Sequence, residues 1–159
     1  VVLLCGTFFW LTSAQAADVN VTWKNPEKYR DIYPSTQGKK HFRESTFKAL
    51  ENHLLKLAKT LPESQTLTIE VTDVDLAGDV HISGIRQIRV IKELYFPRIK
   101  FSFELINAEK AIIQSGNVNL KDMNFMMRSR LRYRNKTLGY EKQLLDGWFK
   151  DVFTNNVDK

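Results

Sequence analysis

The chain has 159 residues, of which 43% are hydrophobic and 26% charged, and its formal net charge at pH 7 is +6. These values exclude a wholly disordered chain, and the length suits one domain with a substantial core. The single cysteine, Cys5, lies in a segment that we expect to be removed. A mature chain without cysteine excludes a thiol nucleophile and a cysteine-based metal site.

The first predicted element is a secretory signal peptide over residues 1–16. Residues 1–11 read VVLLCGTFFWL, an almost unbroken apolar run, and Ala14-Gln15-Ala16 follows as an A-x-A cleavage site. The run is too short to cross a bilayer, which takes about 20 residues. The basic n-region is missing, so we expect the signal to be truncated at its start. We therefore predict cleavage after Ala16, one globular domain over 17–159 and a periplasmic or secreted location.

A strand, a helix and a second strand are predicted next. Apolar and polar residues alternate over 19–23 and again over 66–76, which is typical of strands with one buried face. Between them, residues 41–60 carry an apolar stripe with the spacing of an amphipathic helix, which Pro62 ends. Residues 27–40 are expected to form a connecting loop with about one helical turn. This β-α-β order favours a parallel pair of strands.

The second half of the chain predicts a hairpin and a second helix. A glycine-containing loop and a weaker strand candidate at 87–91 come before the hairpin strands 99–105 and 111–120. Gly116 suggests a β-bulge in the returning strand. Residues 138–153 repeat the helical apolar stripe. The fold class expected is therefore α+β: a single two-layer domain with one mixed, mostly antiparallel sheet of about four to five strands and two amphipathic helices on one face.

The first candidate site is a cluster of carboxylates after the second strand. Alternation places Asp73 and Asp75 on the same face as Val71, and Asp79 follows a glycine turn close to His81. Clustered carboxylates suit a hard cation such as Ca²⁺ or Mg²⁺, although the spacing is not that of an EF-hand. The alternative is that these residues end the strand and hydrogen-bond to backbone amides in a turn. We favour the turn and keep the metal site as an alternative.

The second candidate site is a run of basic residues. Residues 128–142 carry six basic residues and one acidic residue, which accounts for most of the net charge. In an extended segment, side chains two residues apart point the same way, roughly 7 Å apart, so the guanidinium groups would form one face suited to phosphate or carboxylate. A merely solvated charged surface is the alternative. The four arginines are Arg128, Arg130, Arg132 and Arg134.

Catalysis has little support in the sequence. It contains no G-x-S-x-G or H-E-x-x-H motif and no phosphate-binding glycine loop. Of the three histidines, His41, His53 and His81, the second lies beside the apolar stripe of the first predicted helix, where a packed or semi-exposed histidine is the usual state. We therefore assign no catalytic residue and no cofactor, and we expect a binding protein rather than an enzyme.

Several short segments together resemble a known protein family. They are V-T-W at 21–23, N-P-E-K at 25–28, D-V-D-L-A-G at 73–78, D-M-N-F at 122–125, R-Y-R-N at 132–135, Y-E-K at 140–142 and W-F at 148–149. The chain resembles, over nearly all of its mature length, an uncharacterised family of exported bacterial proteins, domain of unknown function 3016. The resemblance implies an exported single-domain bacterial protein and brings no activity, ligand or catalytic residue with it.

These observations lead to one preferred function and two alternatives. We expect a soluble domain exported by a Gram-negative bacterium, whose arginine run binds an anionic envelope partner: a lipid headgroup, a lipopolysaccharide phosphate or an acidic protein surface. Export argues against nucleic acid as the ligand. A metal-assisted hydrolase using the aspartate cluster and a purely structural or assembly role remain open, as does the oligomeric state.

Overall fold

The computed structural model of the protein describes residues 17–34, 38–83, 86–127, 133 and 135–154. Both helices and strands are present, so the prediction of an α+β fold is confirmed. In chain order the elements are β1 (Asp18–Trp23), the short 3-10 helix η1 (Pro26–Lys28), α1 (Lys39–Ala58), β2 (Thr66–Asp75), β3 (Asp79–Ser83), β4 (Arg86–Val90), β5 (Arg98–Ile106), β6 (Ile112–Lys121) and α2 (Gly139–Phe153).

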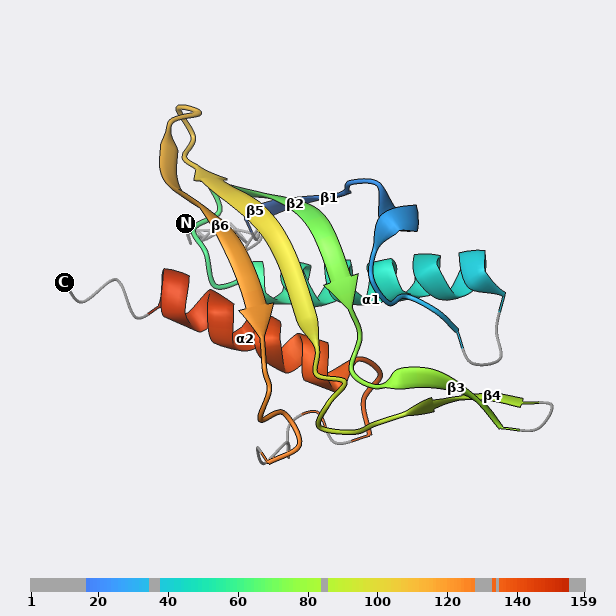
Figure 1. Ribbon diagram of the computed structural model, residues 1–159. Coiled ribbons are helices and arrows are strands. Elements are labelled where there is room, and N and C mark those ends of the chain that lie inside the picture. The colour runs from blue at the N-terminus through green and yellow to red at the C-terminus, as the bar shows by residue number, and fades with distance from the viewer. Residues whose placement is uncertain (1–16, 35–37, 84–85, 128–132, 134, 155–159) are drawn as a thin grey trace, which may run out of the picture.

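Four of the strands form one mixed sheet in the order β1-β2-β5-β6 (Figure 1). β1 runs parallel to β2, as the β-α-β order predicted, and β5 is antiparallel to both of its neighbours. No helix in the described part of the chain is long and apolar enough to cross a membrane.

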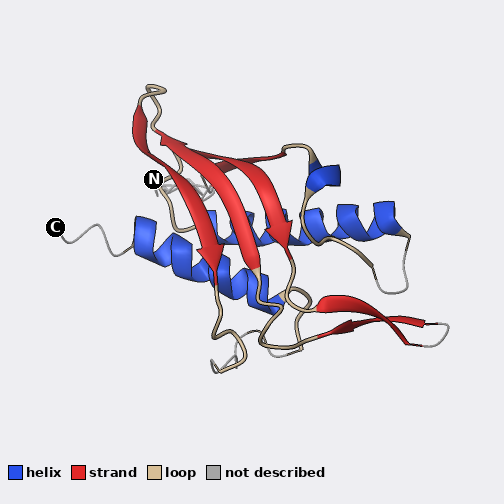
Figure 2. Ribbon diagram, viewed as in Figure 1, coloured by secondary structure: helices blue, strands red, loops and turns tan. Residues whose placement is uncertain are grey.

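β3 and β4 form a separate two-stranded sheet that extends beyond the end of β2 (Figures 1 and 2). The expectation that 87–91 would join a single sheet is therefore wrong, and a loop was expected where β3 lies. The two strands are mostly exposed or half-buried, so neither shows the alternation of buried and exposed residues that marks a strand lying on a core.

The core lies against one face of the four-stranded sheet. Ile69 is opposite Phe103 and Val71 is opposite Phe101, so these four side chains share that face. Trp148 of α2 meets both phenylalanine rings edge-on, with centroid separations of 4.7 Å to Phe101 and 5.3 Å to Phe103. Aromatic pairs of this geometry add to the apolar area that they bury. From α1, Leu50 and Leu54 join the same core.

A β-bulge changes the direction of the side chains near the end of β2. The register with β5 shifts between Val71 and Asp73. One extra residue moves the following side chains to the opposite face. As a result Val71 and Val74 are both in the core, at 1% and 0% exposed. Asp73 and Asp75 therefore do not share the face of Val71, and the simple alternation predicted for this stretch is wrong.

Gly116 does not mark a bulge, contrary to the prediction. It lies directly opposite Phe103, and the register shift falls instead between Leu105 and Ile106, where Ile113 is the extra residue. A Cβ atom at Gly116 would lie 3.2 Å from the Phe103 ring. The glycine therefore makes room for that ring.

Candidate functional site

The four arginines predicted to bind anions, Arg128, Arg130, Arg132 and Arg134, lie outside the described residues. The residues just before this run are described, and three of them are exposed apolar side chains. Met123, Met126 and Met127 are 58%, 45% and 80% exposed, respectively. Apolar side chains therefore gather on the surface immediately next to the arginine run in the sequence.

Asp73 and Asp75 both have partners within the protein. An Asp73 carboxylate oxygen accepts the backbone N–H of Arg30 at 3.0 Å. Asp75 lies 3.9 Å from the Arg30 guanidinium and 3.8 Å from that of Arg98. Burial raises the pKa of Asp75, and the two arginines act in the opposite direction. Both carboxylates thus help to hold the loop after η1 and the start of β5 against the end of β2.

Asp79 is the first residue of β3 and lies opposite Val90 of β4. One of its oxygens accepts the N–H of Val80 at 2.8 Å, and the other is 3.7 Å from Nε2 of His81. The interpretation that we favoured, backbone capping within a turn, stays a prediction for the cluster. Among the residues that the structure describes, no group of three or more His, Cys, Asp and Glu side chains is placed to hold a metal ion.

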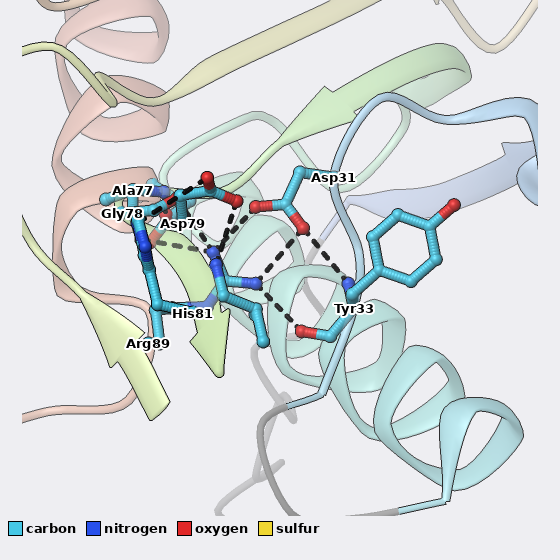
Figure 3. Close-up of polar contacts among 9 residues, drawn as sticks. Asp31, Tyr33, Ala77, Gly78, Asp79, His81 and Arg89 are labelled. Carbon is cyan, nitrogen blue, oxygen red and sulfur yellow. Dashed lines mark hydrogen bonds and ion pairs between the residues drawn. The ribbon is translucent and has the colours of Figure 1, made fainter. Parts of the chain in front are cut away.

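An arginine that the sequence did not single out makes the densest polar network near this cluster (Figure 3). The Arg89 guanidinium of β4 pairs with both carboxylate oxygens of Asp31, at 2.7 and 3.2 Å. It also donates to the carbonyl oxygens of Gly78 at 2.9 Å and Tyr33 at 2.8 Å. Such a bidentate ion pair fixes the orientation of the Arg89 guanidinium and also contributes to stability. Arg89 therefore ties the β3–β4 hairpin to the end of β2 and to the loop before α1.

Glu141, in the first turn of α2, is the most deeply buried of the described carboxylates, with 2% of its surface exposed. It accepts the backbone N–H of Ala77 at 2.7 Å. Burial raises its pKa, whereas the hydrogen bond and the charge of Arg89 act to lower it. This contact anchors the start of α2 to the end of β2.

A separate pocket of about 300 Å³ lies between α1 and the residues around the start of α2. Three of its lining residues are lysines: Lys56 from α1, Lys136 from the preceding loop and Lys142 from α2. No aspartate or glutamate is among the lining residues described. The remaining lining residues are Ala49, Asn52, His53 and Tyr133.

Two residues of the pocket wall, His53 and Tyr133, both contact the carboxylate of Asp146. Nε2 of His53 is 2.8 Å from one oxygen of Asp146, and the Tyr133 hydroxyl donates to the other oxygen at 2.6 Å. The His53 and Tyr133 rings also meet edge-on, with centroids 5.7 Å apart. Hydrogen bonds to a charged group are among the stronger ones in proteins. Asp146 therefore fixes the position of both rings in the pocket wall.

Lys142 is the most constrained of the three lysines. Its ammonium group donates to the Thr137 carbonyl at 2.7 Å. Partial burial lowers its pKa, the charge of Lys136 acts in the same direction, and Glu141 acts against them. An ammonium group that has lost part of its water shell and faces a like charge gains more than an exposed one from a nearby anion.

The loop before α2 is packed closely enough to place Tyr133 in this wall. Lys136 donates its backbone N–H to the Tyr133 carbonyl at 3.0 Å. Asn135 and Leu138 have positive φ angles of 63° and 56°, which turn the chain into the helix. A Cβ atom on Gly139 would lie 3.0 Å from the Tyr133 carbonyl oxygen. A glycine at the first position of α2 therefore permits this approach.

Sequence reasoning found only one end of this pocket. Tyr133 and Lys136 fall within the basic stretch 128–142, but Lys56 belongs to the helix about 80 residues earlier, in which no binding residue was predicted. His53 is packed, at 7% exposed, which is one of the two states expected for it. Its contact with Asp146 joins positions 93 residues apart, and no local pattern signals such a pair.

Comparison with known proteins identifies the family of the chain and nothing further. Residues 17–151 match the model of a family described as "Protein of unknown function (DUF3016)". The chain belongs to this family, as the short segments at 21–28, 73–78 and 122–149 suggested. Neither a curated protein nor a solved structure gave a significant match.

Proposed function

We propose that the chain is an exported, non-catalytic domain that binds an anionic surface of the cell envelope through Arg128, Arg130, Arg132 and Arg134. The observation that carries this proposal is the exposure of Met123, Met126 and Met127 directly before the arginine run. Apolar side chains beside clustered arginines are typical of segments that rest on anionic lipid. The apolar groups enter the interface, and the cations pair with phosphate.

The expected strength follows from the charge of the arginine run. Each basic residue held near an anionic membrane contributes about 1 kcal/mol. Four arginines thus support reversible binding that depends on ionic strength, because the Debye length falls from about 10 Å at 0.1 M salt to about 3 Å at 1 M. An acidic protein surface would show a similar salt dependence, so binding to pure lipid vesicles is the measurement that distinguishes the two partners.

Export is the second part of the proposal. The apolar run and Ala14-Gln15-Ala16 predict a signal peptide that is cut after Ala16. The family match begins at residue 17 and β1 begins at Asp18, directly after that position. This agreement supports a mature domain that starts at Ala17 and works in the periplasm or outside the cell.

Vesicle co-sedimentation tests the binding proposal. The domain 17–159 should sediment with vesicles that contain phosphatidylglycerol and not with pure phosphatidylcholine, and high salt should release it. Arg130→Glu combined with Arg132→Glu should abolish sedimentation. Exchange of Met126 and Met127 for Ser should weaken it. The matched control is Lys48→Glu with Arg86→Glu, an equal change of charge at two exposed positions elsewhere. If the wild type ignores anionic vesicles at low salt, or if the control loses as much, the proposal is wrong.

A further inference from the structure

We infer that the pocket lined by Lys56, Lys136 and Lys142 binds the phosphoryl group of a small organic phosphate. This inference concerns a different set of residues from the proposed membrane contact and does not rest on it. We call the site the lysine pocket and define it by these three residues together with Asn52, His53 and Tyr133.

The charge of the lysine pocket points to an anion. Three ammonium groups come from three separate parts of the fold, and no carboxylate is among the described lining residues. The carboxylate behind the wall, that of Asp146, accepts from Tyr133 with one oxygen and contacts His53 with the other. Asp146 therefore holds the two rings of the wall, and the described lining residues themselves contribute three ammonium groups and no carboxylate.

The chemistry of the donors favours a phosphoryl group over a single carboxylate. Each lysine ammonium acts as a point charge. A phosphoryl group carries up to two negative charges on three free oxygens, so several lysines can contact it at once. The amide of Asn52 can add a further donor at the same wall.

The volume of the pocket limits the rest of the ligand. About 300 Å³ is the lower end of the range for small-molecule sites. This leaves room for a phosphoryl group attached to a body about the size of one sugar ring. The aromatic ring of Tyr133 and the side chain of Ala49 provide an apolar wall for such a body. A phosphorylated sugar, free or as part of a lipid headgroup, is thus the ligand class that fits.

Binding is measured by NMR titration of ¹⁵N-labelled domain 17–159 with glucose 6-phosphate, inorganic phosphate and glucose. Glucose 6-phosphate should shift the amide signals of Asn52, Lys136 and Lys142 in a saturable way. Inorganic phosphate should shift the same signals more weakly, and glucose should not shift them. If neither phosphate shifts these signals, or if glucose does so equally well, the inference is overturned. Vesicles that contain a lipid with a phosphorylated sugar headgroup test whether the sugar phosphate also enters the lysine pocket when it is part of a lipid.

Charge reversal locates the site. Lys56→Glu with Lys136→Glu should weaken glucose 6-phosphate binding about tenfold or more, because each lost charge-assisted contact is a substantial part of the affinity. The matched control, Lys48→Glu with Lys150→Glu, changes the net charge equally at two exposed helix positions and should bind within about twofold of the wild type. Lys56→Gln alone, at an exposed position, tests the pocket if the double variant does not fold. Equal losses in pocket and control variants would overturn the inference.

The two binding surfaces are distinguishable. The Lys56→Glu, Lys136→Glu variant should still sediment with phosphatidylglycerol vesicles, and the Arg130→Glu, Arg132→Glu variant should still bind glucose 6-phosphate. A failure of the vesicle experiment alone leaves the lysine pocket supported, and a failure of the titration alone leaves the membrane proposal supported.

Discussion

Glu141 shows how one buried carboxylate can make the stability of the whole domain depend on pH. Its pKa is raised from the ordinary value of 4.5 because burial disfavours its charged form. The folded state therefore holds this proton more tightly than the unfolded chain does. The contribution of Glu141 to stability is fully present below about pH 4.5 and is lost as the pH rises through its raised pKa.

Exchange of Glu141 for Gln tests this dependence. The amide oxygen of Gln can still accept the Ala77 N–H but carries no charge, so relative to the wild type the variant should gain stability as the pH rises from about 4 to about 7. Urea unfolding at several pH values measures the difference. Glu141→Ala is the contrast: it leaves the Ala77 amide without its partner and should lose roughly 1–3 kcal/mol. A difference between Gln and Glu that does not change with pH would contradict the prediction.

Two glycines of α2 should respond to alanine in opposite directions. A Cβ atom on Gly139 would meet the Tyr133 carbonyl oxygen at 3.0 Å, whereas one on Gly147 would meet nothing within 4 Å. Gly147→Ala should therefore stabilise the domain by roughly 0.5–1 kcal/mol, the usual helical gain. Gly139→Ala should destabilise it and weaken glucose 6-phosphate binding, because Tyr133 must move. Thermal unfolding and titration check both, and a gain of stability in both variants would contradict the packing described.

At the scale of elements, the hairpin of β3 and β4 depends on the pair of Arg89 and Asp31. Both side chains are largely buried, at 19% and 12% exposed. Removal of one partner leaves the other charge without compensation, so Arg89→Ala should cost roughly 3 kcal/mol. It should also make residues 79–90 more sensitive to limited proteolysis. Arg86→Ala, at an exposed position of β4, should change stability by no more than about 0.5 kcal/mol. Equal effects would show that Arg89 does not anchor the hairpin.

The elements that lie on the core were predictable, whereas of the hairpin only β4 was expected, as a weaker strand at 87–91. The two helices and the strands β1, β2, β5 and β6 each carry an apolar face with a clear period, and a periodic pattern is a local property of sequence. β3 and β4 bury little, so they leave no such pattern. The bulge after Val71 was also missed, because one extra residue is visible only against the register of β5.

At the scale of the whole molecule, the export proposal predicts a defined mature chain. Cleavage after Ala16 should remove Cys5, so native material should begin at Ala17 and contain no free thiol. Intact-mass analysis of protein purified from the organism that produces it measures this directly. A chain that retains Cys5 in that material would contradict the prediction.

The lysine pocket also depends on the whole fold, because its residues come from distant parts of the chain. For this reason the sequence did not predict it. Its lysines become neighbours only when α1 and the start of α2 are brought together, and its walls depend on the contact of His53 with Asp146. Each residue alone reads as ordinary helix surface. The arginine run, by contrast, is visible because it is continuous in sequence.

The separate β3–β4 sheet has a consequence for how the domain opens. The hairpin lies outside the main core and is held by the ion pair and hydrogen bonds of Arg89, so we expect it to detach while the four-stranded sheet stays intact. Its backbone amides would then exchange with solvent through a local opening of low free energy. The amides of β2 and β5 would exchange only when the whole domain unfolds. We therefore expect two cooperative units of unequal stability, of which the less stable contacts the loop of Asp31 and Tyr33 that leads into α1.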